Sequence, residues 1–134
     1  MFTFPKTERL CHRELIRDTL NRGKRLRLGA LHASWKIQTS QESIQICKPL
    51  QILISIPKRY TKKAVHRNLK KRHLKEAYRK NKQFLLDFLT EENLSLSLTL
   101  MYNSKEAINA VEAEQMMIEM LHLIYTKLKQ SSAN

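Results

Sequence analysis

The sequence contains very little glycine, proline and cysteine. Only 2 Gly and 3 Pro occur in 134 residues, which excludes a Gly-rich loop of the kind that cradles a phosphate. The two cysteines, Cys11 and Cys47, lie in no CxxC pair, and we expect them to be reduced, with a disulfide as the alternative. No stretch approaches the roughly 18 apolar residues that span a bilayer, and the first residues form no apolar run typical of a signal peptide. These absences predict a cytoplasmic protein.

Acidic residues are scarce in the first two thirds of the chain. Residues 1–82 contain 22 Lys and Arg against 5 Asp and Glu, whereas residues 83–134 contain 3 and 7. So few carboxylates disfavour the two-metal site of a protein nuclease. The histidines lack the HExxH spacing of a zinc site; they are His12, His32, His66, His73 and His122. We therefore expect no catalytic residue and no metal site in the polypeptide itself.

Positive charge is in large excess. The formal net charge is +13, while a hydrophobic content of 42% is enough for one globular core. We expect a single domain over 1–134, with an arm over 1–7, a core over 8–129 and a tail over 130–134. The charge indicates a nucleic-acid partner. An anionic membrane surface is the alternative, disfavoured because the basic segment has no Trp or Phe belt.

The charge is concentrated in residues 58–82, which contain 12 Lys and Arg and a single acid, Glu76. Ala64 to Lys80 contain neither Gly nor Pro, and their composition predicts a helix. On that helix Arg67, Lys71, Lys75 and Arg79 form one row at i, i+4, i+8 and i+12, with Asn68 and Arg72 in the adjacent row. Members of a row stand about 6 Å apart, close to the spacing of phosphates along a strand. Because like charges at i, i+4 repel, an unmixed row favours a polyanionic partner over a merely solvated face.

Apolar periodicity predicts the other elements. A helix from Thr7 ends at Gly23, a strand runs from Leu28 to Gln38, and a second strand region runs from Ile44 to Ile56 with a break or bulge at Pro49. Residues 94–102 alternate strictly and predict a half-buried strand. Ser104 is expected to cap a closing helix that reaches about Lys129, with seven residues facing the core: Ile108, Val111, Ile118, Leu121, Ile124, Tyr125 and Leu128. The order of elements predicts an α+β fold, a two-layer sandwich with helices on one face of the sheet and the other face free for a ligand.

The segment from Ala64 to Arg79, AVHRNLKKRHLKEAYR, resembles the signature helix of the bacterial ribonuclease P protein subunit. The usual form of that helix is A-V-x-R-N-R-x-K-R-x-x-R-E-A-[FY]-R. The preceding ISIPKRYTKKAV is similar to the family's connection from strand to helix, and FPKTERL at 4–10 is similar to its N-terminal arm. Two departures stand out. Leu69 takes the third place of the Arg-Asn-Arg triplet, next to Lys70 where the family prefers an aliphatic residue, and Ile16 and Leu20 replace aromatics usual in the first helix.

The resemblance implies a ribosomal-protein-like fold with a left-handed strand–helix–strand crossover. It also implies that the chain binds the catalytic ribonuclease P RNA and the 5′ leader of precursor tRNA, and assists Mg²⁺-dependent removal of that leader. In this family the RNA performs the hydrolysis and mainly holds the Mg²⁺, with no obligate protein partner. Carried over by position, the implied RNA-binding residues are Lys58, Arg59, Lys62, Lys63, Arg67, Asn68, Lys71, Arg72, Lys75 and Arg79. The implied leader cleft is bordered by Phe4, Lys6, Arg9 and Trp35, whose aromatics would stack on bases.

Three other functions remain as alternatives at this point. The first is a ribosomal or ribosome-assembly RNA-binding protein of the same fold, which would copurify with ribosomal particles. The second is a stand-alone protein nuclease, disfavoured by the missing catalytic cluster. The third is DNA binding, disfavoured because no helix-turn-helix pattern precedes the basic helix.

Overall fold

The structure, a computed structural model, describes residues 13–38, 50–92 and 94–132. Four helices and four strands follow one another in these ranges. Their order is α1 (Arg13–Arg22), β1 (Lys24–Leu28), β2 (Leu31–Gln38), β3 (Leu50–Ser55), α2 (Ala64–Asn81), α3 (Gln83–Glu91), β4 (Ser95–Tyr102) and α4 (Ala110–Ser132). Within the described ranges, no helix is both long enough and apolar enough to cross a membrane.

The strands form one sheet in the order β1-β2-β4-β3. β1 pairs with β2, and β2 with β4, in antiparallel fashion, whereas β3 and β4 are parallel. Parallel neighbours need a crossover connection, and here α2 and α3 make it between β3 and β4. The α+β class and the strand–helix–strand unit expected from the sequence are confirmed.

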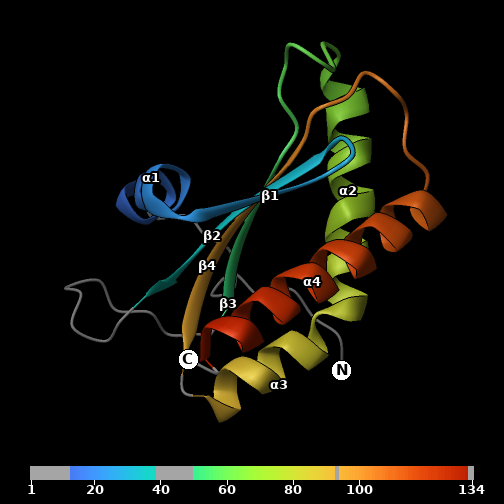
Figure 1. Cartoon of the computed structure of the whole chain (residues 1–134). Coiled ribbons are helices and arrows are strands. Elements are labelled where there is room, and N and C mark those ends of the chain that lie inside the picture. Colours follow the sequence, from blue (N-terminus) through green and yellow to red (C-terminus); the bar gives the residue numbers. More distant parts are fainter. Residues whose placement is uncertain (1–12, 39–49, 93, 133–134) are drawn as a thin grey trace.

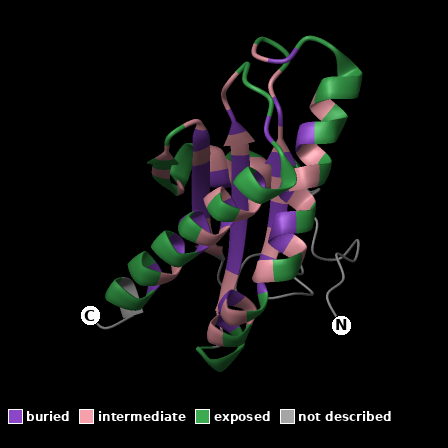
Figure 2. Cartoon of the chain, turned by 90° about the vertical axis from the view of Figure 1, so that its right-hand side faces the viewer, coloured by how far each residue is buried: buried purple, intermediate pink, exposed green. Residues whose placement is uncertain are grey.

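The hydrophobic core lies between one face of the sheet and the helices α2, α3 and α4 (Figure 1). Residues 96, 98 and 100 of β4 and residues 50, 52 and 54 of β3 alternate onto this face and are buried. The helices cover them with Leu74, Tyr78, Leu85, Met117 and Met120, each fully buried. Figure 2 shows the same division, with buried strands and helices whose outer sides are exposed.

Helix α1 lies on the opposite face of the sheet, which the sequence-based prediction left free (Figure 1). Two of its contacts with the sheet are polar. Thr19 Oγ1 and Ser97 Oγ share a hydrogen bond of 2.6 Å in a buried position, and Lys36 forms an ion pair with Asp18. Because α1 covers part of this face, the face is only partly free. The sequence did not predict this, because apolar periodicity does not detect polar contacts.

Strand β1 was not predicted, because the first strand expected from the sequence begins only at Leu28. Both glycines of the chain lie at its ends. Gly23 closes α1 by donating its N–H to Thr19 O at 3.0 Å. Gly29 has a φ of 57° in the turn between β1 and β2, a conformation that glycine adopts without steric cost. The two glycines therefore fix the start and the end of this edge strand.

The start of α4 differs from the prediction. Asn109 Oδ1 accepts the N–H of Glu112 at 2.8 Å and caps the helix, whereas Ser104 Oγ accepts the N–H of Glu106 in the preceding loop. The predicted cap at Ser104 is therefore wrong by five residues. Val111, predicted to face the core, is 64% exposed.

The predictions for the arm, the two cysteines and the strand residues 44–49 lie outside the described residues.

Candidate nucleic-acid interface

Helix α2 buries one side and exposes a cationic one. Lys70, Leu74, Ala77 and Tyr78 form the buried side. The first turn contains no acidic residue and the last turn contains Arg79 and Lys80. Because α2 packs against β3 and α4, the side of the helix that faces away from them is left on the surface of the molecule.

The predicted RNA-binding residues fall into two groups by exposure. Six are exposed: Lys58, Arg59, Lys62, Lys63, Asn68 and Arg72. The four members of the predicted row are partly buried: Arg67, Lys71, Lys75 and Arg79. A row at i, i+4 turns by about 40° at each step, so Arg67 lies close to the buried side of the helix, whereas Arg79 lies near the outermost line and forms an ion pair with Glu76 there. Contact of all ten with RNA stays a prediction.

Arg67 and Arg79, at the two ends of the row, each have a partner within the protein. Arg67 Nη1 donates to Thr61 O at 3.1 Å and to Lys62 O at 2.7 Å, which holds the segment that leads into the helix. Arg79 forms an ion pair with Glu76, and its Nε donates to Glu76 Oε2 at 3.1 Å. This hydrogen bond lowers the pKa of Glu76 and raises that of Arg79. Arg67 and Arg79 therefore have contacts within the protein in addition to the RNA contact predicted for them.

The exchange at positions 69 and 70 inverts the usual placement of charge. Leu69 is 45% exposed, whereas Lys70 is only 4% exposed. Lys70 Nζ donates to Thr61 Oγ1 at 2.7 Å and to Ser104 O at 3.2 Å, and lies 5.3 Å from the centre of the Tyr102 ring. Desolvation lowers the pKa of Lys70. The sequence contained a signal for this placement, because Lys70, Leu74 and Ala77 follow the i, i+4, i+7 spacing of one helix side.

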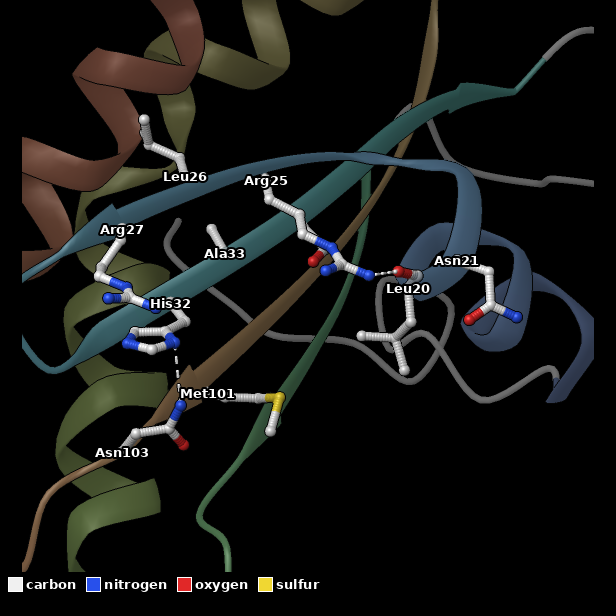
Figure 3. A pocket seen from close by; sticks show the side chains of 10 residues that line it. Leu20, Asn21, Arg25, Leu26, Arg27, His32, Ala33, Met101 and Asn103 are labelled. Atoms are coloured by element: carbon white, nitrogen blue, oxygen red, sulfur yellow. Dashed lines mark hydrogen bonds between the residues drawn. The ribbon is translucent and has the colours of Figure 1, made fainter.

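A cleft of about 430 Å³ lies between the end of α1 and the open face of the sheet (Figure 3). We call it the α1 cleft. Its polar and charged walls come from α1, β1, β2 and the end of β4: Asn21, Arg25, Arg27, His32, Ser34 and Asn103. Leu20 and Met101 contribute apolar surface. A cleft lined by charged, hydrogen-bonding and apolar side chains suits a single strand of nucleic acid, whose unpaired bases can reach them, better than a duplex.

Hydrogen bonds hold the polar walls of the α1 cleft in place. Arg25 Nη2 donates to Leu20 O at 2.9 Å. The Asn103 side-chain nitrogen lies 3.0 Å from His32 Nδ1 and donates to it, as Figure 3 shows. Burial, and then the charge of Arg27, lower the pKa of His32. A neutral His32 that accepts at Nδ1 has its proton on Nε2, where it can donate to a phosphate or base oxygen.

The residues expected to border a leader cleft are not confirmed. Trp35 is 3% exposed and lies in the hydrophobic core, so the prediction that it borders the cleft is wrong. It shares its side of β2 with the buried Leu31 and Ala33, and the period of two would have placed it there. Phe4, Lys6 and Arg9 lie outside the described residues. Sequence reasoning missed His32 and Asn103, because a contact between β2 and the end of β4 depends on the pairing of the strands.

Comparisons with known proteins agree with this architecture. The family model described as Ribonuclease P matches residues 4–127. Ribonuclease P protein components from two Porphyromonas gingivalis strains, ATCC 33277 and W83, are each 30% identical over 105 residues, which cover 78% of this chain and 74% of the relative. The solved structure of a Staphylococcus aureus RNase P protein superimposes with a TM-score of 0.61 at 13% identity and covers 88% of this chain and 94% of that one. The family match over most of the sequence, together with the two relatives, shows that the chain belongs to the Ribonuclease P family of proteins.

Proposed function

We propose that this protein is the RNA-binding subunit of a ribonuclease P, in which a catalytic RNA removes the 5′ leader of precursor tRNA. Family membership supports participation in an endoribonuclease complex. The observation that carries the RNA-binding role is the outer side of α2 and its approach, where Lys58, Lys62, Lys63 and Arg72 are exposed together. Cations in such an array neutralise phosphates and release condensed counterions. We propose that the protein carries out this role in the cytoplasm.

The two surfaces suit two different RNAs. The outer side of α2 offers mainly charge, which fits the backbone of a large folded RNA. The α1 cleft adds hydrogen-bonding groups that can reach bases, namely Asn21, His32 and Asn103. Sequence-specific and single-strand recognition of RNA uses groups of this kind. We therefore assign the catalytic RNA to α2 and the single-stranded leader to the α1 cleft.

Magnesium does not fit the lining of either surface. Mg²⁺ prefers carboxylate and phosphate oxygens, whereas the α1 cleft is lined by Arg, His and Asn side chains without a carboxylate. Among the described residues, no three His, Cys, Asp or Glu side chains gather at one place. We therefore propose that the RNA holds the Mg²⁺ of the reaction. The protein lowers the repulsion between the two RNAs.

Reconstitution tests this function. The purified, RNA-free protein is mixed with the catalytic RNA from the same source and a precursor tRNA at low Mg²⁺, and leader removal is followed over time. We expect the protein to stimulate cleavage by the RNA and to cleave nothing when the RNA is omitted. Arg72→Ala together with Lys71→Ala should weaken stimulation at limiting protein, whereas Lys127→Ala on the exposed side of α4 should not. Cleavage by protein alone, or copurification with ribosomal particles in place of one large RNA, would overturn the proposal.

A further inference from the structure

We propose that a second pocket, at the N-terminal end of α2, holds one unpaired nucleotide of an RNA partner, with its base on an apolar wall and its phosphate on lysines. We call it the α2 pocket. It has a volume of about 430 Å³ and lies between the segment leading into α2 and the loop that follows β4. This inference rests on the proposed RNA-binding function and names the kind of nucleotide that one part of the surface takes.

The cationic part of the pocket contains four lysines. Lys62, Lys63 and Lys105 are exposed at its rim, and Lys70 is buried. None of the described residues that line the pocket is acidic. Lys63 stands at the N-cap of α2 without a side-chain capping bond, and the first turn has no acidic residue. The partial positive charge of the helix end thus adds to that of the lysines.

Lys70 makes this a built site rather than a loose group of surface lysines. Its side chain is 4% exposed, and its Nζ donates to Thr61 Oγ1 and Ser104 O, at 2.7 and 3.2 Å. These two bonds tie the segment before α2 to the loop after β4, which are the two walls of the pocket. A buried ammonium whose hydrogen bonds go to neutral oxygens retains an uncompensated charge. An anion at the pocket supplies the missing negative charge.

The apolar part distinguishes a nucleotide from a bare phosphate. Leu69, Ala107 and Ile108 line the pocket beside the lysines. Leu69 is 45% exposed. It therefore offers apolar surface directly beside the lysines, which a site for a bare phosphate does not need. Tyr60 adds an aromatic ring, with the Arg59 guanidinium 5.0 Å from its centre.

The combination of walls and volume selects the ligand. Bases turned out of a helix bind to proteins by contact with aromatic and apolar side chains, while Lys and Arg bind their phosphates. A volume of about 430 Å³ falls within the usual range for pockets that bind small organic groups. A base inside a duplex exposes only its edge and cannot enter, so the ligand is an unpaired nucleotide in a bulge, a loop or an end.

Titration with small probes tests the pocket in the full-length protein. Adenosine 5′-monophosphate, adenosine and inorganic phosphate are added separately at constant ionic strength, and methyl resonances are followed by NMR. We expect the monophosphate to bind at least about tenfold tighter than either of the other two, a difference of about 1.4 kcal/mol. It should also shift the methyl signals of Leu69 and Ile108.

Variants locate the site. Lys105→Ala, in an exposed loop position, should weaken binding of the monophosphate by fivefold or more, while Lys127→Ala removes the same charge elsewhere and should leave it unchanged. Leu69→Asn should reduce affinity for the monophosphate to that for phosphate. Because Lys70 ties two loops together, its substitution can disturb folding, and the test does not depend on it.

Three outcomes overturn the inference. Equal binding of phosphate and monophosphate without shifts at Leu69 and Ile108 would show an anion site only. An oligoglutamate peptide that shifts these signals at lower concentration would show a site for acidic protein segments. Unchanged binding of the monophosphate in Lys105→Ala and in Leu69→Asn, with normal stimulation of cleavage in reconstitution, would refute the pocket and leave the proposed function intact. Failure of reconstitution with normal monophosphate binding would refute the proposed function instead.

Discussion

Lys70 places an ammonium group inside the interface between α2 and two loops. Its hydrogen-bond partners among the described residues, Thr61 Oγ1 and Ser104 O, are neutral, and no carboxylate of the described residues forms an ion pair with it. Desolvation lowers the pKa of Lys70 below its ordinary value of 10.5. The residue therefore joins two loops by hydrogen bonds at an electrostatic cost that depends on pH.

The cost predicts how stability changes with pH. Between the lowered pKa of the folded state and the ordinary value, the unfolded chain binds more protons at Lys70 than the folded chain. The free energy of unfolding should therefore gain a positive contribution from Lys70 as pH rises through that window. In Lys70→Met this contribution is absent. Urea unfolding at several pH values from neutral to 10.5 measures it as a wild-type-minus-variant difference that grows with pH, whereas Lys127→Met gives a flat difference. A flat difference for Lys70→Met would show that its ammonium is not desolvated.

At the scale of elements, the junction of α1 with the sheet depends on Gly23. A Cβ at this position would overlap with Thr19 O and stand 2.6 Å from Trp35 O, both backbone atoms. Backbone atoms cannot rotate away as a flexible side chain can, so the end of α1 and β2 would have to separate. The same junction positions Asn21 and Arg25 in the α1 cleft.

Substituting the two glycines one at a time distinguishes the effect of steric overlap at Gly23 from the effect of backbone strain at Gly29. Gly23→Ala should lower the free energy of unfolding by about 1–3 kcal/mol through overpacking, and should also weaken binding of a single-stranded leader oligonucleotide. Gly29→Ala meets nothing within 4 Å and is strained only through its φ of 57°, at about 1–2 kcal/mol. It should leave leader binding unchanged at temperatures where both variants are folded. Urea unfolding and fluorescence titration measure the two effects. Equal loss of leader binding in both variants would contradict this role for the α1 junction.

Helix α2 gives a prediction about salt. Lys71, Arg72 and Lys75 lie in its middle, between Arg67 and Arg79. Replacing all three with Ala should make the plot of log affinity for the catalytic RNA against log salt shallower by roughly two to three units. Arg67→Ala should instead lower stability, because its guanidinium holds the segment before the helix. Filter binding at several salt concentrations gives the slopes; an unchanged slope in the triple variant would exclude the middle of α2 from the RNA contact.

At the scale of the whole molecule, alternation and composition predicted most of the core. Residues 94–102 predicted β4, and the basic segment predicted α2 nearly to its ends. The face of the sheet under α1 was not predictable in this way, because Thr19, Ser97 and Lys36 make polar contacts there. Trp35 was misplaced because the resemblance, rather than the phase of β2, assigned its side. The candidate site was predicted where one helix forms it, and missed where distant strands meet, as at His32 and Asn103.

The net charge of +13 predicts how the free protein responds to anions. Like charges on 22 basic residues in the first 82 positions repel one another in the compact state, which lowers the free energy of unfolding. Anions that bind the folded state alone stabilise it by RT ln(1 + [L]/Kd), about 2.7 kcal/mol at a hundredfold excess over Kd. Sulfate or phosphate should therefore raise the Tm above that in sodium chloride of the same ionic strength, and the increase should saturate. Calorimetry in both salts measures the difference. Screening depends on ionic strength alone, so equal Tm values in the two salts would mean that the cations lower stability only by general repulsion and form no sites for phosphate-like groups.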